Sequence, residues 1–409
     1  MIIADLQIHS RYARACSRNT NFDLLEKYAR IKGLNLLGTG DFQHPIWNKE
    51  IKEKLKEDEN GILWSKTGFP FIWQTEISLM YKQVKSRKVH HLIFSPNTEV
   101  SDQVIHALSK KGRLDYDGRP IFGFTSIELV DMMKEINDKI EIIPAHCMTP
   151  YFGLYGSISG FDSLQECFQD NAKHIHAVET GMSADPTMLW RFNDAKRINL
   201  VSFSDAHSYW PWRLGREATV FDFKELTYDN VIKAIRTGNG LKSTIETSPS
   251  YGKYHYDGHR SCKINFSPEQ TKKANGICPK CSKPMTIGVL NRVNELAGEK
   301  EGFKPENAKN FIDLIPLTEL IATNLNTKSL SSQKVWLIYN NLIGKFNNEL
   351  NVLINISYND LINVVDAKLA KLIVDIRNGK LEIIPGYDGV YGEILAGSHS
   401  AKQNTLNNF

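Results

Sequence analysis

Residues 2–10 of the chain, IIADLQIHS, place an aspartate, a glutamine and a histidine in alternation with apolar residues. This alternation predicts a β-strand over residues 2–8, with Asp5, Gln7 and His9 on one face. Apolar residues at helical spacing over residues 22–32, closed by Gly33, predict that a helix follows. The N-terminus therefore predicts a strand-helix unit with polar side chains at the end of its strand.

The same alternation of strands and helices continues to about residue 250. Apolar runs predict seven strands, over residues 2–8, 34–38, 69–77, 89–94, 140–145, 175–179 and 199–203. Further helical patterns cover residues 102–110, 126–136, 186–195 and 228–236. Together they predict an α/β fold with a largely parallel sheet closed into a barrel.

Histidines and acids follow these predicted strands at equivalent positions. They are His9, Asp41, His44, Glu76, His90, His91, His146, Glu179, Asp205 and His207. One such residue alone is more often a core histidine or a helix N-cap. Several of them at strand ends indicate a polynuclear metal site, because carboxylates bridge cations and imidazoles complete their ligand shells. Neighbours on a strand face opposite ways, so only one of His90 and His91 is expected to face the metals.

A second metal site is predicted between residues 251 and 298. The spacings His259-x-x-Cys262 and Cys278-x-x-Cys281 supply four ligands for tetrahedral zinc, with His255 as a rival to His259. Eight basic residues against three acids give this segment a net charge of +5, within a chain whose formal total is +4. A basic, aromatic-bearing module of this kind favours contact with a DNA backbone, although it would also serve to tie two domains together.

The chain of 409 residues is thereby divided into three predicted units: a barrel over 1–250, a zinc-ribbon-like module over 251–298 and a mainly helical domain over 299–409. The last unit is predicted to end in a strand and a glycine-rich turn over 380–394, with residues 403–409 frayed. No apolar stretch approaches the length of a membrane-spanning helix, and the cysteine content does not suggest a secreted disulfide scaffold. A cytoplasmic protein without membrane contact is expected.

Several motifs resemble those of the polymerase and histidinol phosphatase (PHP) family. They are DLQIHS at Asp5, GTGDFQHP at Gly38, TEIS at Thr75, VHHL at Val89, PAH at Pro144 and SDAHS at Ser204. The longer strings TPYFGLYGSISGFDSLQECF, ETGMSADP, SDAHSYWPWRLGREA, DGHRSC, CPKC and PGYDGVYG resemble the endonuclease Q family of PHP-type DNA repair nucleases, over nearly the whole chain.

The resemblance implies a distorted (β/α)7 PHP barrel that nicks DNA 5′ to a deaminated base (uracil, hypoxanthine or xanthine) or an abasic site. It implies two or three catalytic Zn, Mn or Mg ions. Their ligands would be His9, Asp41, His44, Glu76, one of His90 and His91, His146, Asp205 and His207. Gln7 stands where the family motif usually has a histidine, so its amide oxygen would be a weak ligand and a third metal would bind loosely.

Catalytic and DNA-binding residues are predicted around these ligands. Asp205 or His207 is expected to accept the proton of the attacking water. Arg11, Arg213 and Arg216 are candidates to bind phosphate, with surface ion pairs as the equally weighted alternative. Phe152, Tyr155 and Ser157, in an aromatic, glycine-rich loop, are candidates to hold a flipped base, and Trp212 is a candidate to act as a wedge or wall, with packing as the alternative for the aromatic residues.

Three other functions compete with lesion nicking: a small-molecule PHP phosphatase, a 3′–5′ exonuclease and a weakly active DNA-binding scaffold. The basic module and the added C-terminal domain disfavour the phosphatase, and no polymerase follows the barrel as it does in the exonucleases. Damaged DNA is the predicted partner. A sliding clamp is a second candidate partner, although no clamp-binding motif is evident at the C-terminus. The sequence leaves the oligomeric state open.

Overall fold

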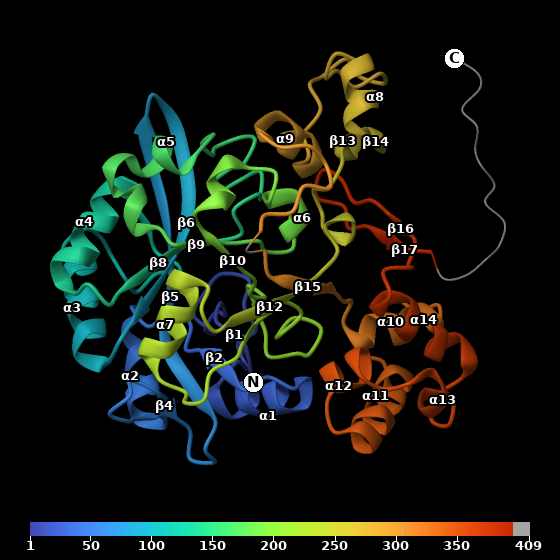
Figure 1. Cartoon of the computed structure of the whole chain (residues 1–409), viewed down its shortest axis with the longest axis horizontal. Coiled ribbons are helices and arrows are strands. Elements are labelled where there is room, and N and C mark those ends of the chain that lie inside the picture. The colour runs from blue at the N-terminus through green and yellow to red at the C-terminus, as the bar shows by residue number, and fades with distance from the viewer. Residues whose placement is uncertain (307, 396–409) are drawn as a thin grey trace.

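A computed structural model describes residues 1–306 and 308–395. A strand forms in each of the seven predicted regions: β1 (Ile2–Asp5), β2 (Leu36–Gly38), β5 (Pro70–Gln83), β6 (Lys85–Ser95), β8 (Glu141–Pro144), β9 (Ala177–Glu179) and β10 (Asn199–Val201). Most are shorter than predicted, but β5 and β6 are much longer and form one hairpin that rises beyond the rest of the sheet (Figure 1).

Hydrogen bonds connect these seven strands from neighbour to neighbour and return to the first. The pairs β1–β2, β2–β5 and β9–β10 are parallel. The Cys147 N–H donates to Glu179 O (2.9 Å) just beyond β8, and the His9 N–H donates to Ala206 O (2.9 Å) between the segments that follow β1 and β10. Strand β6, however, pairs antiparallel with both β5 and β8. The predicted largely parallel arrangement therefore has a reversed strand among its seven.

The remaining strands extend this sheet or form small pairs. The sheet continues from β1 through β11 (Ala218–Phe221) and β12 (Leu241–Glu246) to β15 (Asn310–Asp313). On the other side lie β3 (Lys56–Glu57), β4 (Leu63–Trp64) and β7 (Ile121–Phe122). Because β15 pairs with β12, a segment of the predicted C-terminal unit belongs to the large sheet. The overall class is mixed α/β, with a large mixed sheet.

Helices surround the sheet in the first 250 residues: α1 (Phe22–Lys32), α2 (Pro45–Lys54), α3 (Thr98–Ser109), α4 (Ser126–Ile136), α5 (Leu164–Phe168), α6 (Pro186–Leu189) and α7 (Tyr228–Thr237). Helix α1 ends as predicted, at Gly33 with φ of 103°, a left-handed conformation that glycine adopts without strain. The pattern over 186–195 forms only the short α6, followed by a 3-10 turn. Apolar residues from the sheet, from α1 to α6 and from the C-terminal helices form one core, and a second core lies between the sheet and α7.

The region beyond residue 250 contains a small module and a helical cluster. The module includes β13 (Asp257–His259), β14 (Ile264–Phe266), α8 (Pro268–Lys273) and α9 (Val289–Leu296). The cluster, on the right in Figure 1, contains α10 (Leu317–Asn324), α11 (Gln333–Phe346), α12 (Glu349–Ile354), α13 (Tyr358–Leu361) and α14 (Ala367–Arg377). The chain then forms β16 (Ile383–Ile384) and β17 (Glu393–Ile394), where a strand and turn were predicted. The predicted fraying of residues 403–409 lies outside the described residues.

No helix in the described ranges is long and apolar enough to cross a membrane.

Candidate active site

Two groups of potential metal ligands lie side by side at one end of the seven strands. One consists of His9, Asp205 and His207, and the other of Glu76, His90 and His146. The ligand atoms of each group lie within 4.8 Å of one another. They come from β5, β6 and the segments that follow β1, β8 and β10, so residues far apart in sequence converge as predicted from the strand ends.

Glu76 connects the two groups. Its Oε2 lies 2.8 Å from His9 Nε2, and its Oε1 lies 2.7 Å from His90 Nδ1 and 3.2 Å from His146 Nε2. His9 Nε2 is also 3.0 Å from Asp205 Oδ1. One carboxylate oxygen thus faces each group, which is the arrangement that a carboxylate bridging two cations requires.

The backbone turns sharply at three predicted site residues. Asp41, His146 and Asp205 have φ values of 40°, 30° and 48°, in the left-handed region that residues other than glycine rarely adopt. Each follows directly or closely on a strand, and the turn directs its side chain across the end of the sheet. Such conformations persist only where the surrounding structure holds them, and they concentrate at functional sites.

Burial and mutual contact shift the pKa values of these groups. Burial would raise the pKa of Glu76, but Arg119, whose Nη1 lies 3.3 Å from Glu76 Oε2, and His90 hold it well below its usual range. Burial lowers the pKa of His90 to about 4, against the attraction of Glu76. Burial likewise lowers the pKa of His207. His90 and His207 are therefore neutral near pH 7 and have a ring nitrogen lone pair available.

The donor set fits divalent cations. The four histidines of the two groups offer imidazole nitrogens, and the two acids, Glu76 and Asp205, offer carboxylate oxygens. Mixed nitrogen and oxygen ligands of this kind suit zinc, manganese or iron. The ring of His146 also has a buried Nδ1 without a hydrogen-bond partner among the described residues, so its orientation is determined by the Nε2 that faces Glu76.

Two predicted ligands lie beside the two groups and not within them. Asp41 Oδ1 lies 2.9 Å from His9 Nδ1, and its Oδ2 accepts the Ser10 N–H (2.6 Å). Asp41 thus orients the ring of His9, as carboxylates behind metal-binding histidines commonly do. His44 stacks on Tyr12, with 4.4 Å between ring centroids and 11° between ring planes. It is the N-cap residue of α2 and is not a member of either ligand group.

The structure distinguishes between His90 and His91. His90 contacts Glu76 and His146, whereas His91 faces the opposite side of β6 and hydrogen-bonds through Nε2 to Ser126 Oγ (2.9 Å). Burial lowers the pKa of His91 to about 3, so it is a neutral core residue.

Gln7 differs from the expectation of a weak metal ligand. Its buried side-chain amide faces the Glu179 carboxyl group, and in the orientation that turns the amide nitrogen toward Glu179 this nitrogen donates to Oε2 over 2.6 Å. The same oxygen accepts the His146 N–H (2.6 Å). Burial raises the pKa of Glu179 well above its usual range. Gln7 therefore positions the Glu179 carboxyl group, and this group stabilises the backbone turn at His146 by accepting its N–H.

Sequence reasoning missed Arg119, which lies outside every motif. It follows a polar loop with no periodic pattern, and only the fold brings it to Glu76. The charge of Glu76 and other nearby acids raises the pKa of Arg119 above its already high value, although burial lowers it.

A cavity of about 320 Å³ adjoins the two ligand groups. Phe152 and Arg216, two of the predicted DNA-binding residues, line it together with His90, His146 and Asp205. The Phe152 ring lies 4.5 Å from that of His90, and Arg216 donates from Nε and Nη2 to Ser204 O (3.1 and 2.9 Å). Lys253, Tyr254 and Tyr391 close its other side, so the barrel and the later segments share it.

Five other predicted DNA-binding residues lie away from this cavity. Tyr155 is 1% exposed, and its hydroxyl donates to Asp194 Oδ2 (3.0 Å), so it belongs to the core. Ser157 donates to Ile287 O (3.1 Å) and connects its loop to the zinc module. Trp212 stacks on Trp210, and Arg11 pairs with Glu50 (2.6 Å) as the ion-pair alternative supposed. Arg213 is not among the residues that line the cavity.

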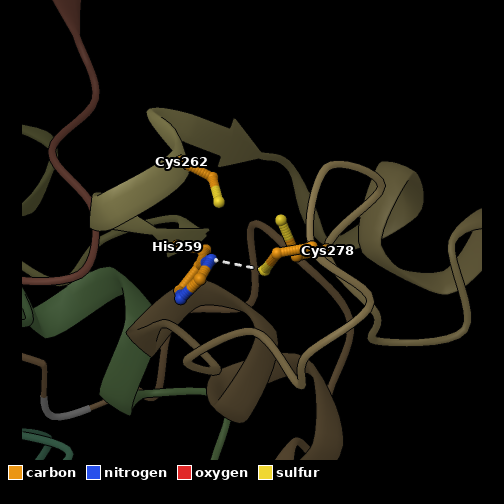
Figure 2. Close-up of side chains that lie close together, drawn as sticks. His259, Cys262 and Cys278 are labelled. Atoms are coloured by element: carbon orange, nitrogen blue, oxygen red, sulfur yellow. Dashed lines mark hydrogen bonds between the residues drawn. The ribbon is translucent and has the colours of Figure 1, made fainter.

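The Cys/His cluster predicted for zinc also forms. Potential ligand atoms of His259, Cys262, Cys278 and Cys281 lie within 4.8 Å of one another, and Figure 2 shows His259, Cys262 and Cys278 directed toward a common centre. His259 Nδ1 lies 3.3 Å from Cys281 Sγ. Burial raises the pKa of Cys278, but hydrogen bonds from Lys280 N–H and His259 outweigh it and lower the pKa to about 6, which favours a thiolate ligand. His255 lies outside the cluster.

These features define a class: mixed α/β proteins with candidate metal sites at the ends of the strands and a small Cys/His module. The described chain superimposes with a TM-score of 0.86 on the lesion-specific endonuclease PfuEndoQ from Pyrococcus furiosus, at 33% identity over 96% of this chain and 94% of that one. It superimposes with a TM-score of 0.87, at 33% identity over 99% and 100%, on an Endonuclease Q solved with a 27-mer duplex bearing an abasic lesion at the active site. The chain belongs to the endonuclease Q family.

Two further comparisons identify relatives of this chain. Residues 316–380 match the protein-family model of the MJ0043 C-terminal domain. The uncharacterized protein MJ0043 of Methanocaldococcus jannaschii is 32% identical over 336 residues, 79% of this chain, and the chain spans 40% of that relative's length.

Proposed function

We propose that this chain is a metal-dependent endodeoxyribonuclease that hydrolyses the phosphodiester 5′ to a deaminated base (uracil, hypoxanthine or xanthine) or an abasic site. The observation that carries the proposal is the near full-length similarity to an Endonuclease Q that holds an abasic duplex. The seven-strand ring with one reversed member supports its assignment as a distorted (β/α)7 PHP barrel. The division into units 1–250, 251–298 and 299–409 stays a prediction.

Two catalytic cations would be held by the two groups already described, with Glu76 between them. Asp41 would orient His9 from behind. Bound divalent cations supply Lewis-acid activation of a water molecule and neutralise charge on the phosphoryl oxygens. His259, Cys262, Cys278 and Cys281 would hold a structural zinc ion.

Asp205 and His207 are the proposed proton acceptors. Their side chains are 30% and 28% exposed, whereas His9 and Glu76 are fully buried, so they are more open to solvent. His207 Nδ1 donates to the Asp205 backbone carbonyl (2.9 Å), which leaves Nε2 as the one unprotonated nitrogen of the neutral ring. This atom would either bind a cation or, where no cation holds it, accept the proton.

The substrate would be held by arginines and aromatic rings. Arg119 and Arg216 present guanidinium groups at the ligand groups and in the adjoining cavity, where they would bind phosphate oxygens. The extruded nucleotide would enter the cavity, against Phe152 and Tyr254. The basic residues of the zinc module would contact the DNA backbone outside it.

A nicking assay tests the proposal. Duplex DNA with one uracil, hypoxanthine or abasic site is incubated with the protein and Mn²⁺ or Zn²⁺, and a single cut 5′ to the lesion is expected. Asp205→Asn should abolish cutting and retain most DNA affinity. Asp222→Asn, the same change at an exposed residue, should cut like the wild type.

Other outcomes would contradict the proposal. Progressive shortening from a 3′ end would favour an exonuclease, and hydrolysis only of small phosphate esters would favour a phosphatase. Lesion binding without any cut in the presence of metal would favour a scaffold. A nick that persists in Asp205→Asn would refute the role of the ligand groups.

A further inference from the structure

The β5–β6 hairpin extends far beyond its neighbours in the sheet. Strands β1 and β2 end at Asp5 and Gly38, and Gly38 pairs with Ile72 of β5. Strand β5 continues past Glu76 to Gln83, and β6 returns from Lys85. Because β5 runs parallel to β1 and β2, this extension rises from the same end of the sheet that carries the ligand groups (Figure 1).

The two faces of the extension have different environments. Tyr81 and Arg87 are paired across the strands and buried, and the Arg87 guanidinium hydrogen-bonds to Gly160 O and Glu166. On the other face, Met80 pairs with Lys88 and Lys82 pairs with Ser86. Met80, Lys82 and Ser86 are exposed, and Lys88 is half-buried.

The exposed face is continuous with the active site. Side chains alternate along a strand, so Met80 and Lys82 share a face with Glu76, and Ser86 and Lys88 share it with His90. Lys88 Nζ lies 5.7 Å from the centre of the Phe152 ring, and that ring lies 4.5 Å from His90. A chain of contacts thus leads from the second ligand group to Lys88.

The charge of this face is not neutralised within the protein. Neither Lys82 nor Lys88 forms an ion pair with any residue in the described ranges, whereas Arg87 on the opposite face pairs with Glu166. The tip of the hairpin adds an exposed apolar side chain. Val84 is 95% exposed and has φ of 62°, which is unfavourable for a β-branched residue.

We propose that Met80, Lys82, Ser86 and Lys88, here called the hairpin basic face, bind the backbone of duplex DNA on one side of the scissile phosphate. The inference rests on the proposed nuclease function. Lys82 lies six residues beyond Glu76, which is about 20 Å along an extended strand. Phosphates of one DNA strand rise about 3.4 Å each along the axis, so Lys82 meets the backbone about six nucleotides from the cut.

The test measures DNA affinity as a function of salt for Lys82→Ala and Lys88→Ala, all in the Asp205→Asn background to prevent cutting. The probe is a labelled duplex with one abasic-site analogue and at least about ten base pairs on each side. Each lysine contact contributes about 0.9 to the slope of log affinity against log salt. Raising salt from 50 to 200 mM should therefore weaken the parent about 3.5-fold more than either variant.

Lys85→Ala is the matched control. It removes the same charge from the same hairpin, but Lys85 pairs with Gln83 and so belongs to the opposite face. Its salt slope should equal that of the parent. An equal loss of slope in Lys85→Ala and Lys82→Ala would overturn the proposal, because it would mean a general charge effect. Unchanged thermal unfolding of Lys82→Ala, expected for an exposed side chain, verifies folding.

A second measurement uses duplexes shortened to about three base pairs on one side of the lesion, made separately for each side. One of the two should weaken binding by the parent, and Lys82→Ala should lose no further affinity on that duplex. If Lys82→Ala weakens binding by the same factor on both shortened duplexes as on the full-length duplex, the proposal is also overturned. If the intact protein neither binds nor nicks lesion DNA, the proposed function itself fails. If it nicks correctly while Lys82→Ala and Lys88→Ala keep the parent slope, only the hairpin proposal fails.

Discussion

Lys32 and Glu349 form a buried ion pair between the large sheet domain and the C-terminal helices. Their side chains are 1% and 0% exposed, and Lys32 Nζ donates to Glu349 Oε1 (2.7 Å) and to Pro211 O (2.8 Å). Pro211 lies in the segment that follows His207, between Trp210 and Trp212. We predict that Lys32→Met destabilises the contact between these parts and loosens that segment.

The expected cost follows from what the substitution leaves unpaired. Removal of one partner of a buried pair typically costs 3–5 kcal/mol, because the other charge remains buried. Glu349 keeps two hydrogen-bond donors, the Leu317 N–H (2.9 Å) and the Tyr339 hydroxyl (2.8 Å). Because these donors partly stabilise its charge, we expect the unpaired Glu349 to cost about 3 kcal/mol, the lower end of this range. The Pro211 carbonyl also loses its partner, at about 1 kcal/mol. Methionine fills most of the volume, so a total of about 4 kcal/mol is expected.

Urea denaturation followed by tryptophan fluorescence measures this cost, because three tryptophans lie at the contact between the Pro211 segment and the C-terminal helices. Trp210 stacks on Trp212 at 5.0 Å between ring centroids, and Trp336 of α11 lies 5.7 Å from Trp210. Glu349→Gln in the Lys32→Met background removes the unpaired charge and should recover about 2 kcal/mol. Lys27→Met, at an exposed position of the same helix, should change stability by less than about 0.5 kcal/mol. A cost of Lys32→Met below about 1 kcal/mol, or no recovery by Glu349→Gln, would refute the reasoning.

Three further predictions concern other parts of the chain. Burial raises the pKa of Glu246 to about 8, so the folded state retains a proton that the unfolded chain loses near pH 4.5, and stability falls as pH rises between these values. Urea titrations at several pH values should show that Glu246→Gln removes this part of the pH dependence. Cys278→Ser should lower bound zinc by one equivalent in elemental analysis, whereas Cys16→Ser, outside the cluster, should leave it unchanged. Arg119→Lys should slow nicking by about 10²-fold because it loses the planar guanidinium at Glu76, and the exposed Arg113→Lys should nick at the wild-type rate.

The site was predictable from sequence where local pattern determines position. His9, Glu76, His146 and Asp205 each accompany a strand with a clear apolar pattern, so alternation and strand ends were sufficient to bring them together. The Cys/His cluster was predictable because its spacing alone defines two pairs of ligands.

Other features depend on contacts that local pattern does not encode. The pairing partner of a strand is a long-range property, so neither the reversal of β6 nor the role of Arg119 follows from nearby residues. Tyr155 shows the same limit: its loop has the composition of a binding loop, but Asp194 and Phe192 place its ring in the core. Asp41 has the right residue type for a ligand, but its 2.9 Å contact with His9 Nδ1 is a long-range contact that no local pattern predicts.

The register of the β5–β6 hairpin links the chemistry of the site to the surface above it. Ser78 pairs with His90, and this pairing decides that His90 and not His91 joins Glu76. The same pairing decides that Lys82 and Lys88 lie on the face that carries Glu76 and His90, while Arg87 is buried against Glu166. A slip of one residue would turn every side chain of β6 to the other face, removing His90 from the ligands and Lys88 from the exposed face together. Buried Tyr81 and Val89 oppose such a slip, so the apolar face of the hairpin maintains both the ligand geometry and the placement of the lysines.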